Sequence, residues 1–256
     1  MYQIFQYLKF LFSSSNQHGV HSPFVFDMVV KCFYDKTPYP DYAALKAYRS
    51  ELTESKKEIS VEDFGSGSRV FKSRLRSVSK MAKTSGTPLK RMKLLFQLVN
   101  YFKPTKILEL GTSLGLSTSA MALGNPASEI LTVEGCHESF KIAQNQFEKF
   151  GLNNISARNE RFETTIPELR QNRYDLIFFD GNHNKKATLD YFEKLLATSH
   201  NESIFIFDDI YWSKDMTEAW EIIKNHPKVT VTIDTFHWGF VFFRTEQAKE
   251  HFKIRV

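Results

Sequence analysis

The sequence has few cysteines: two, Cys32 and Cys136, among 256 residues. Two cysteines cannot build a disulfide framework, and neither lies in a CxxC pair or in a histidine-rich spacing that would favour structural zinc. We therefore expect a reducing, cytoplasmic setting and two buried thiols that pack as small hydrophobic groups.

Apolar runs long enough to span a bilayer are also missing. The N-terminal stretch MYQIFQYLKFLFSSS is apolar and aromatic, but Gln3, Gln6 and Lys9 interrupt it and it is too short to span a bilayer. We expect no transmembrane segment. The stretch is predicted to be an amphipathic helix that acts as a cap or a homodimer contact, with a membrane-surface contact as the alternative.

Acidic residues are absent from residues 72–93. The eight basic residues of this segment are Lys72, Arg74, Arg76, Lys80, Lys83, Lys90, Arg91 and Lys93. Without them, 34 − 8 = 26 basic residues face 29 acidic ones, so the segment carries the whole positive excess of the +5 chain. Such a run is either a solvated face or a contact for an anionic substrate, nucleic acid or lipid headgroup.

Apolar runs alternate with helix-like stretches from residue 105 onward. Strands are predicted at 105–111, 129–135, 154–159, 174–181, 203–209, 229–234 and 239–244, and helices at 117–124, 137–151, 186–199 and 213–225. This alternation is typical of a parallel sheet with helices on both faces, and the short turn TFHW makes the last strand antiparallel. We predict an α/β fold with a Rossmann-like, doubly wound, seven-stranded, mostly parallel sheet.

Residues 1–85 do not follow this alternation. Ser22 and Pro23 suit the N-cap and first position of a helix, and the basic run 69–80 is predicted to be a helix. We therefore divide the chain into a helical and extended N-terminal cap, residues 1–85, on the acceptor side or at a dimer contact, and a sheet domain, residues 86–256.

Two glycine-rich stretches follow acidic residues: EDFGSGS at 62–68 and ELGTSLG at 109–115. A cofactor loop in such a sheet leaves the end of a buried strand and turns into a helix. The second stretch fits, because ILEL precedes it and Ser117 can cap the helix that follows. The first stretch follows a weak, charged strand, so we interpret it as a hinged lid or acceptor wall, or as a plain connection.

The spacing in the second loop indicates the kind of cofactor. Gly111 and Gly115 are separated by three residues, unlike the GxGxxG of a dinucleotide loop, and Glu109 would repel a pyrophosphate but can hold an ammonium group. Glu134 ends the next strand, where its two oxygens can accept both ribose hydroxyls. An adenosine ligand with an ammonium group and no phosphate fits S-adenosylmethionine better than NAD.

Five motifs in this order resemble the class I methyltransferases, most closely the catechol-type and sugar-type O-methyltransferases: ILELGTSLGLS, TVEG, FETTIPEL, FFDGNH and FDDIYWS. The resemblance implies that S-adenosylmethionine is held by Glu109, Gly111, Thr112, Ser113, Gly115, Ser117, Glu134, Gly135, Arg161, Phe162 and Asp180. The methionine part lies on the loop, the ribose on Glu134, and the adenine along Arg161 and Phe162. The family usually has glycine where this chain has Glu160.

The fourth predicted strand ends in FFDGNH, which offers a general base. Methyl transfer to oxygen is an in-line displacement that needs the hydroxyl proton removed. In the catechol-type enzymes a lysine stands three residues after the strand-end aspartate, and in a sugar-type branch a histidine does. We therefore expect Asp180 and His183 to be catalytic, with His183 as the base.

Asp208 and Asp209 end the fifth predicted strand and should lie beside Asp180. Three converging carboxylates suit a hard cation, so Mg²⁺ or Ca²⁺ on Asp180, Asp208 and Asp209 is predicted, and a metal-free site is the alternative. Tyr211 and Trp212 either wall the acceptor site or pack in the core.

The sequence therefore predicts an S-adenosylmethionine-dependent O-methyltransferase of a small, hydroxylated and potentially anionic acceptor. The alternatives are an RNA methyltransferase that uses residues 72–93, and, in other classes, an NAD(P)-dependent oxidoreductase or a non-catalytic binding protein.

Overall fold

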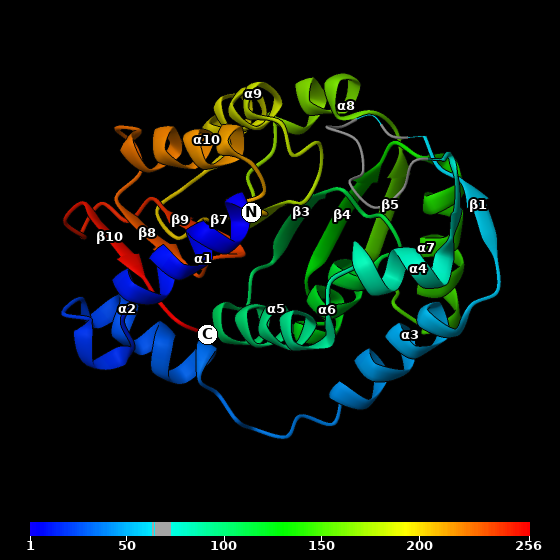
Figure 1. Cartoon of the computed structure of the whole chain (residues 1–256), viewed down its shortest axis with the longest axis horizontal. Helices are drawn as coiled ribbons and strands as arrows, with labels where there is room; N and C mark the ends of the chain where they lie inside the picture. The colour runs from blue at the N-terminus through cyan, green and yellow to red at the C-terminus, as the bar shows by residue number, and fades with distance from the viewer. Residues whose placement is uncertain (63, 65–72) are drawn as a thin grey trace. The chain divides into compact units, whose positions relative to one another are not determined.

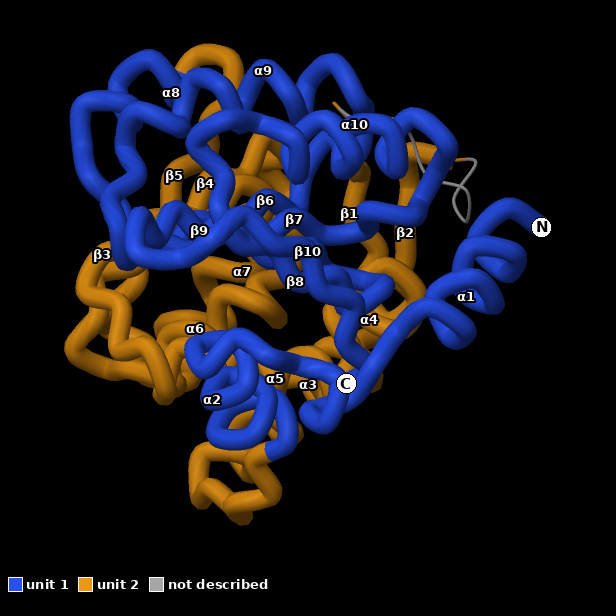
Figure 2. The backbone as a smooth tube through the Cα atoms, turned by 90° about the vertical axis from the view of Figure 1, so that its left-hand side faces the viewer, with its two compact units in different colours: residues 1–34, 165–256 blue, residues 35–164 orange. Residues whose placement is uncertain are grey.

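The computed structural model describes residues 1–62, 64 and 73–256. Most of EDFGSGS lies outside the described residues, so its role as a lid or acceptor wall stays a prediction. Contacts divide the chain into two compact units, residues 1–34 with 165–256 and residues 35–164 (Figure 2). The functional division at residue 85 also stays a prediction.

The unit of residues 35–164 is built on three parallel strands in the order β3-β4-β5 (Figure 1). Its elements are α3 (Tyr42–Glu54), β1 (Glu58–Ser60), β2 (Leu75–Ser77), α4 (Val78–Thr84), α5 (Leu89–Phe102), β3 (Lys106–Leu110), α6 (Leu116–Gly124), β4 (Glu129–Glu134), α7 (His137–Lys149) and β5 (Ile155–Asn159). β3 is buried on both faces from Ile107 to Leu110, as is typical of a central parallel strand.

The other unit holds five strands in the order β10-β8-β9-β7-β6. Its elements are α1 (Tyr2–Ser13), η1 (Gln17–Gly19), α2 (Pro23–Met28), η2 (Val29–Phe33), β6 (Leu176–Phe179), α9 (Lys185–Leu195), η3 (Leu196–Thr198), β7 (Ile204–Asp208), α10 (Lys214–Asn225), β8 (Val231–Asp234), β9 (Trp238–Phe242) and β10 (Glu250–Lys253). The helix α8 (Phe162–Leu169) spans the boundary between the units.

The predicted fold class is confirmed. All seven predicted strands are present as β3 to β9, and β9 runs antiparallel to both β7 and β8. One strand was missed: β10 pairs with β8 in parallel. Its residues Glu250 and His251 are exposed, so the segment lacks the buried apolar run on which the strand prediction rested.

The predicted helix at 69–80 is wrong where the structure describes it. Residues Leu75–Ser77 form β2, which pairs antiparallel with β1, and the helix α4 begins only at Val78. The Ser77 hydroxyl accepts a hydrogen bond from the Lys80 amide at 3.4 Å and caps α4. The described part of the basic segment, residues 73–93, therefore covers β2, α4 and the start of α5.

The predicted helix start at Pro23 is confirmed. The Ser22 hydroxyl accepts a hydrogen bond from the Val25 amide at 3.4 Å, and Pro23 occupies the first helical position. Across the described residues, no helix is long and apolar enough to cross a membrane.

Candidate active site

The loop between β3 and α6 turns through left-handed backbone conformations. Gly111 has φ 111°, Ser113 has φ 48° and Gly115 has φ 77°. The amides of Gly111 and Thr112 both donate to the Val133 carbonyl in β4, at 2.9 and 3.4 Å. The loop is therefore fastened to the neighbouring strand while its tip stays exposed.

The aromatic side chains of Tyr48 and Phe147 pack against Gly115. Tyr48 of α3 donates its hydroxyl to the Leu114 carbonyl at 3.0 Å, and an added Cβ on Gly115 would lie 2.5 Å from the Phe147 ring of α7. A residue with a side chain does not fit here, so the loop between β3 and α6, the predicted cofactor loop, requires this glycine.

Glu109 lies inside the sheet rather than at the loop mouth. Its side chain is fully buried, and its Oε2 accepts hydrogen bonds from the Thr118 and Thr132 hydroxyls. Its Oε1 has no hydrogen-bond partner among the described residues. Burial raises the pKa of Glu109 to about 7, against the lowering effect of the two threonine hydrogen bonds.

Glu134 stands at the end of β4 and is fixed by two backbone amides. The Ser113 amide donates to its Oε2 and the Cys136 amide donates to its Oε1, each at 2.7 Å. The carboxylate thus joins the tip of the cofactor loop to the end of the next strand. Each carboxylate oxygen can accept more than one hydrogen bond. Glu134 can therefore also accept hydrogen bonds from ribose hydroxyls, and that contact stays a prediction.

Ser117 does not cap α6, which corrects the prediction. Gly115 is the N-cap residue, and no side chain caps the helix. The buried Ser117 hydroxyl lies 2.7 Å from the hydroxyl of Thr87, which sits just before α5. Sequence reasoning missed Thr87, because it belongs to no motif and lies 30 residues before its partner.

Arg161, which is predicted to lie along the adenine, contacts Phe64. The Arg161 guanidinium carbon lies 4.3 Å from the centre of the Phe64 ring, and an added Cβ on Gly135 would lie 2.8 Å from the same ring. Phe162 begins α8 directly after Arg161. The described part of EDFGSGS thus contacts predicted cofactor residues, and Phe64 was not among the predicted site residues.

The second group of candidate residues lies at the ends of β6 and β7, in the other unit. Asp180, His183 and Asp208 each offer a ligand atom, and these three atoms lie within 4.8 Å of one another. His183 Nε2 lies 3.7 Å from Asp180 Oδ1. Two carboxylates and an imidazole at this spacing can bind a divalent cation or move a proton.

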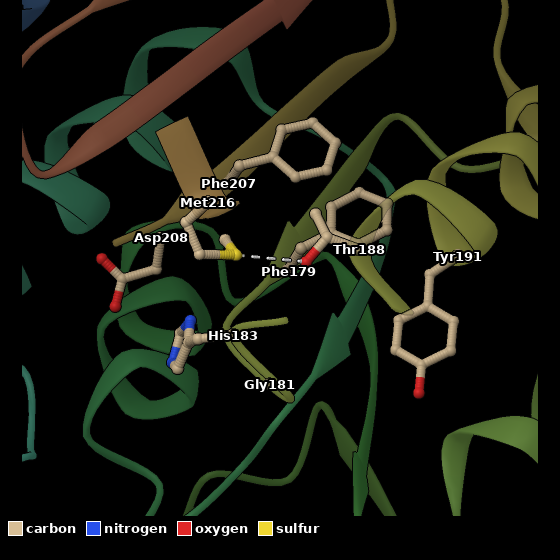
Figure 3. A pocket seen from close by; sticks show the side chains of 8 residues that line it. All are labelled: Phe179, Gly181, His183, Thr188, Tyr191, Phe207, Asp208 and Met216. Carbon is tan, nitrogen blue, oxygen red and sulfur yellow. Dashed lines mark hydrogen bonds between the residues drawn. The ribbon is translucent and has the colours of Figure 1, made fainter. Parts of the chain in front are cut away.

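A small pocket adjoins this cluster (Figure 3). His183 and Asp208 lie on one side of it, and the remaining wall consists of Phe179, Gly181, Thr188, Tyr191, Phe207 and Met216. The Thr188 hydroxyl donates to the Met216 sulfur at 3.6 Å. The wall is therefore largely apolar, with the titratable groups concentrated on one side.

The turn that carries His183 is held at both ends. Asn182 has a left-handed backbone with φ 58°, and its amide group donates to the Tyr191 hydroxyl at 3.0 Å. Asn184 caps α9 by accepting from the Ala187 amide at 3.3 Å. The DGNH sequence thus positions its histidine between a tight turn and a helix cap.

Asp209 lies outside the three-residue cluster. Its backbone is left-handed, with φ 54°, and its carbonyl accepts from the Trp212 amide at 2.8 Å. The third residue of the cluster is His183, whereas the sequence predicted Asp209 beside Asp180 and Asp208. The role of Asp209 as a metal ligand stays a prediction.

Tyr211 packs in the core, which was one of the two alternatives for this residue; the other was a wall of the acceptor site. Its hydroxyl donates to Asp234, and its ring stacks on Phe236 with centres 5.2 Å apart. Burial raises the pKa of Asp234. The helix α10 is capped by Ser213, whose hydroxyl accepts from the Met216 amide at 3.1 Å.

The described part of the basic segment, residues 73–93, belongs to the unit of residues 35–164. Lys93 Nζ lies 4.5 Å from the centre of the Tyr42 ring, so at least this cation packs on an aromatic face. A role in RNA binding stays a prediction.

Comparison with known proteins finds a similarity over the central part of the chain. Residues 108–210 match the family model described as a methyltransferase domain. This range begins within β3 and ends just after β7, so it includes both the cofactor loop and the Asp180, His183 and Asp208 cluster.

Several solved structures share the fold. The SAH-bound methyltransferase PaMTH1 of Podospora anserina has a TM-score of 0.61 at 15% identity, covering 88% of this chain and 97% of its own. An O-methyltransferase of Bacillus cereus in complex with SAH has a TM-score of 0.54 at 18% identity, covering 83% and 96%. The O-methyltransferase TomG of Streptomyces achromogenes, in complex with SAM, has a TM-score of 0.54 at 18% identity, covering 62% and 81%.

Residues 108–210 are therefore similar to a methyltransferase domain, and the chain shares its fold with solved methyltransferases.

Proposed function

We propose that the chain is an S-adenosylmethionine-dependent O-methyltransferase of a small hydroxylated acceptor, with His183 as the general base. The observation that carries this proposal is the cluster of Asp180, His183 and Asp208 at the ends of β6 and β7. The methyltransferase family model covers the cluster, and solved O-methyltransferases share the fold.

The residues of the cofactor loop fit S-adenosylmethionine. The unpartnered, buried Oε1 of Glu109 is an acceptor suited to an ammonium group, and Glu134 is held rigidly by two backbone amides. Gly111 and Ser113 have backbone conformations that let a ligand approach the loop. When bound, S-adenosylmethionine supplies a methyl group on a sulfonium, which an oxygen nucleophile can displace.

His183 is proposed to take the proton of the acceptor hydroxyl on Nε2. Asp180 lies 3.7 Å from that nitrogen, beyond direct hydrogen-bond distance but close enough to stabilise an imidazolium by charge. Phe179, Phe207 and Met216 place apolar side chains along one side of the cluster.

Asp180 and Asp208 are proposed to hold a divalent cation through carboxylate oxygens. Hard cations such as Mg²⁺ prefer oxygen ligands, and the two carboxylates lie close enough to share one ion. Such an ion would lower the pKa of an acceptor hydroxyl. Chelation followed by readdition of Mg²⁺ or Ca²⁺ tests the proposed metal. If chelation leaves the activity unchanged, the metal has no role and His183 is the sole activating group.

The test of the function is transfer of a labelled methyl group from S-adenosylmethionine to a panel of catechols, phenols and sugars. His183→Ala is expected to lower kcat by about 10²- to 10⁴-fold, the usual contribution of a general base. His200→Ala is the matched control, because His200 forms a comparable pair with Asp175, at 3.0 Å. Label on nitrogen or carbon, or equal activity of His183→Ala and wild type, would contradict the proposal.

A further inference from the structure

The helix α1 presents large apolar side chains to solvent. Among the described residues, eight of the twelve exposed large hydrophobic side chains lie within residues 1–30. On α1, Ile4, Leu8 and Phe12 recur every four residues and therefore share one face, and Phe5 lies beside them. Phe12 is 91% exposed and Ile4 66%, so this face is a solvent-exposed apolar stripe.

The opposite face of α1 is attached to its own unit. Tyr7 and Phe10 contact the Phe236 ring, with ring centres 4.8 and 5.7 Å apart. Tyr2 donates its hydroxyl to Thr217 of α10 at 2.8 Å. Turning the stripe inward would break these contacts, so the outward direction of Ile4, Leu8 and Phe12 is built into the packing.

Two cations contact α1, and one of them lies at the edge of the stripe. Residues 1–26 contain no Asp or Glu. Lys9 is exposed at the edge of the stripe, with its Nζ 4.5 Å from the centre of the Phe5 ring, and Lys253 Nζ donates to the Ser13 hydroxyl at 3.4 Å. An apolar helix face flanked by cations is the composition of a helix that lies in the interface of an anionic membrane.

A second copy of the chain suits the stripe less well. α1 has 12 residues and is therefore about 18 Å long. Its outward apolar side chains are far fewer than the roughly 20–30 residues that each partner contributes to a stable interface. A lipid surface needs no complementary shape, so a short stripe suffices there.

We propose that α1 docks the protein on an anionic membrane surface. Ile4, Leu8 and Phe12 enter the boundary between headgroups and acyl chains, and Lys9 remains among the anionic headgroups. The helix is too short to cross the bilayer, so the protein lies on the membrane. This surface is independent of the proposed methyl transfer and binds vesicles without cofactor.

The test is co-sedimentation of the full chain with phosphatidylcholine vesicles prepared with and without phosphatidylserine. The wild type is expected to pellet with the anionic vesicles, and a Leu8→Ser, Phe12→Ser double variant is expected to lose at least about tenfold in partitioning. Ile222→Ser is the matched control, because Ile222 on α10 is as exposed as Leu8, at 48%. Thermal unfolding of each variant verifies that it is folded.

Three results would overturn the proposal. The first is a wild type that does not pellet with anionic vesicles or pellets equally with phosphatidylcholine alone. The second is a double variant that pellets as well as the wild type. The third is a dimeric wild type and a monomeric double variant, neither of which binds vesicles. A second copy of the chain would then cover the stripe.

Discussion

A Cβ atom added to Gly115 would collide with the hydroxyl of Tyr48, the side chain that holds the cofactor loop through the Leu114 carbonyl. The glycine and the tyrosine lie far apart in the sequence, on the loop and on α3. The N-terminal helix α3 thus determines which residue the loop can carry.

Gly115→Ala is expected to destabilise the protein and to abolish binding of S-adenosylhomocysteine. The left-handed backbone alone costs a non-glycine residue about 1–2 kcal/mol, and the collisions with Tyr48 and Phe147 add to it. Gly151→Ala is the control, since Gly151 also has a positive φ, 64°, but no atom within 4 Å of an added Cβ. Urea unfolding and calorimetric titration measure the two effects, and equal losses in the two variants would contradict the steric account.

Tyr48→Phe is expected to weaken cofactor binding while leaving the fold intact. The variant keeps the buried ring and removes one hydrogen bond, worth about 0.5–1.5 kcal/mol. Tyr39→Phe also removes hydroxyl hydrogen bonds, to Asp35 and Asn100, away from the loop. If Tyr39→Phe lowers the affinity for S-adenosylhomocysteine as much as Tyr48→Phe does, the hydroxyl of Tyr48 has no special role in positioning the loop.

The sequence was sufficient to predict the parallel sheet, the glycine-containing loop between β3 and α6 and the acidic strand ends, because these depend on local apolar runs and on the residues directly after them. It was not sufficient for contacts made by side chains distant in sequence. Thr87 meets Ser117, and Tyr48 supports Leu114, only because the folded chain brings α5 and α3 to the loop. The burial of Glu109 was missed for the same reason, since Thr118 and Thr132 satisfy one of its oxygens from neighbouring elements.

The pH dependence of stability is expected to carry the signature of Glu109. Burial raises the pKa of Glu109 from 4.5 to about 7 in the folded chain, so the folded state holds this proton more tightly than the unfolded state does. Its contribution to stability is therefore largest below about pH 4.5 and declines as the pH rises to about 7. The free energy of unfolding, measured in urea at a series of pH values, is expected to lose this decline in Glu109→Gln. If the variant and the wild type have the same dependence on pH, Glu109 does not titrate in this range.

Cofactor binding is expected to have the opposite pH dependence. An ammonium group favours the ionised form of Glu109, so the affinity for S-adenosylhomocysteine should increase as the pH rises through about 7. Binding near that pH should release a proton, which calorimetry in buffers of different ionisation enthalpy detects. Glu109→Gln should bind more weakly and without this proton release, and release that persists in the variant would assign the proton to another group.

The most direct measurement is calorimetric titration of the full chain with S-adenosylhomocysteine and, separately, with NADH, because it requires no knowledge of the acceptor. We predict saturable binding of S-adenosylhomocysteine with one ligand per chain, a marked loss of affinity in Glu134→Gln, and no binding of NADH. Binding of NADH without binding of S-adenosylhomocysteine would contradict the proposed function.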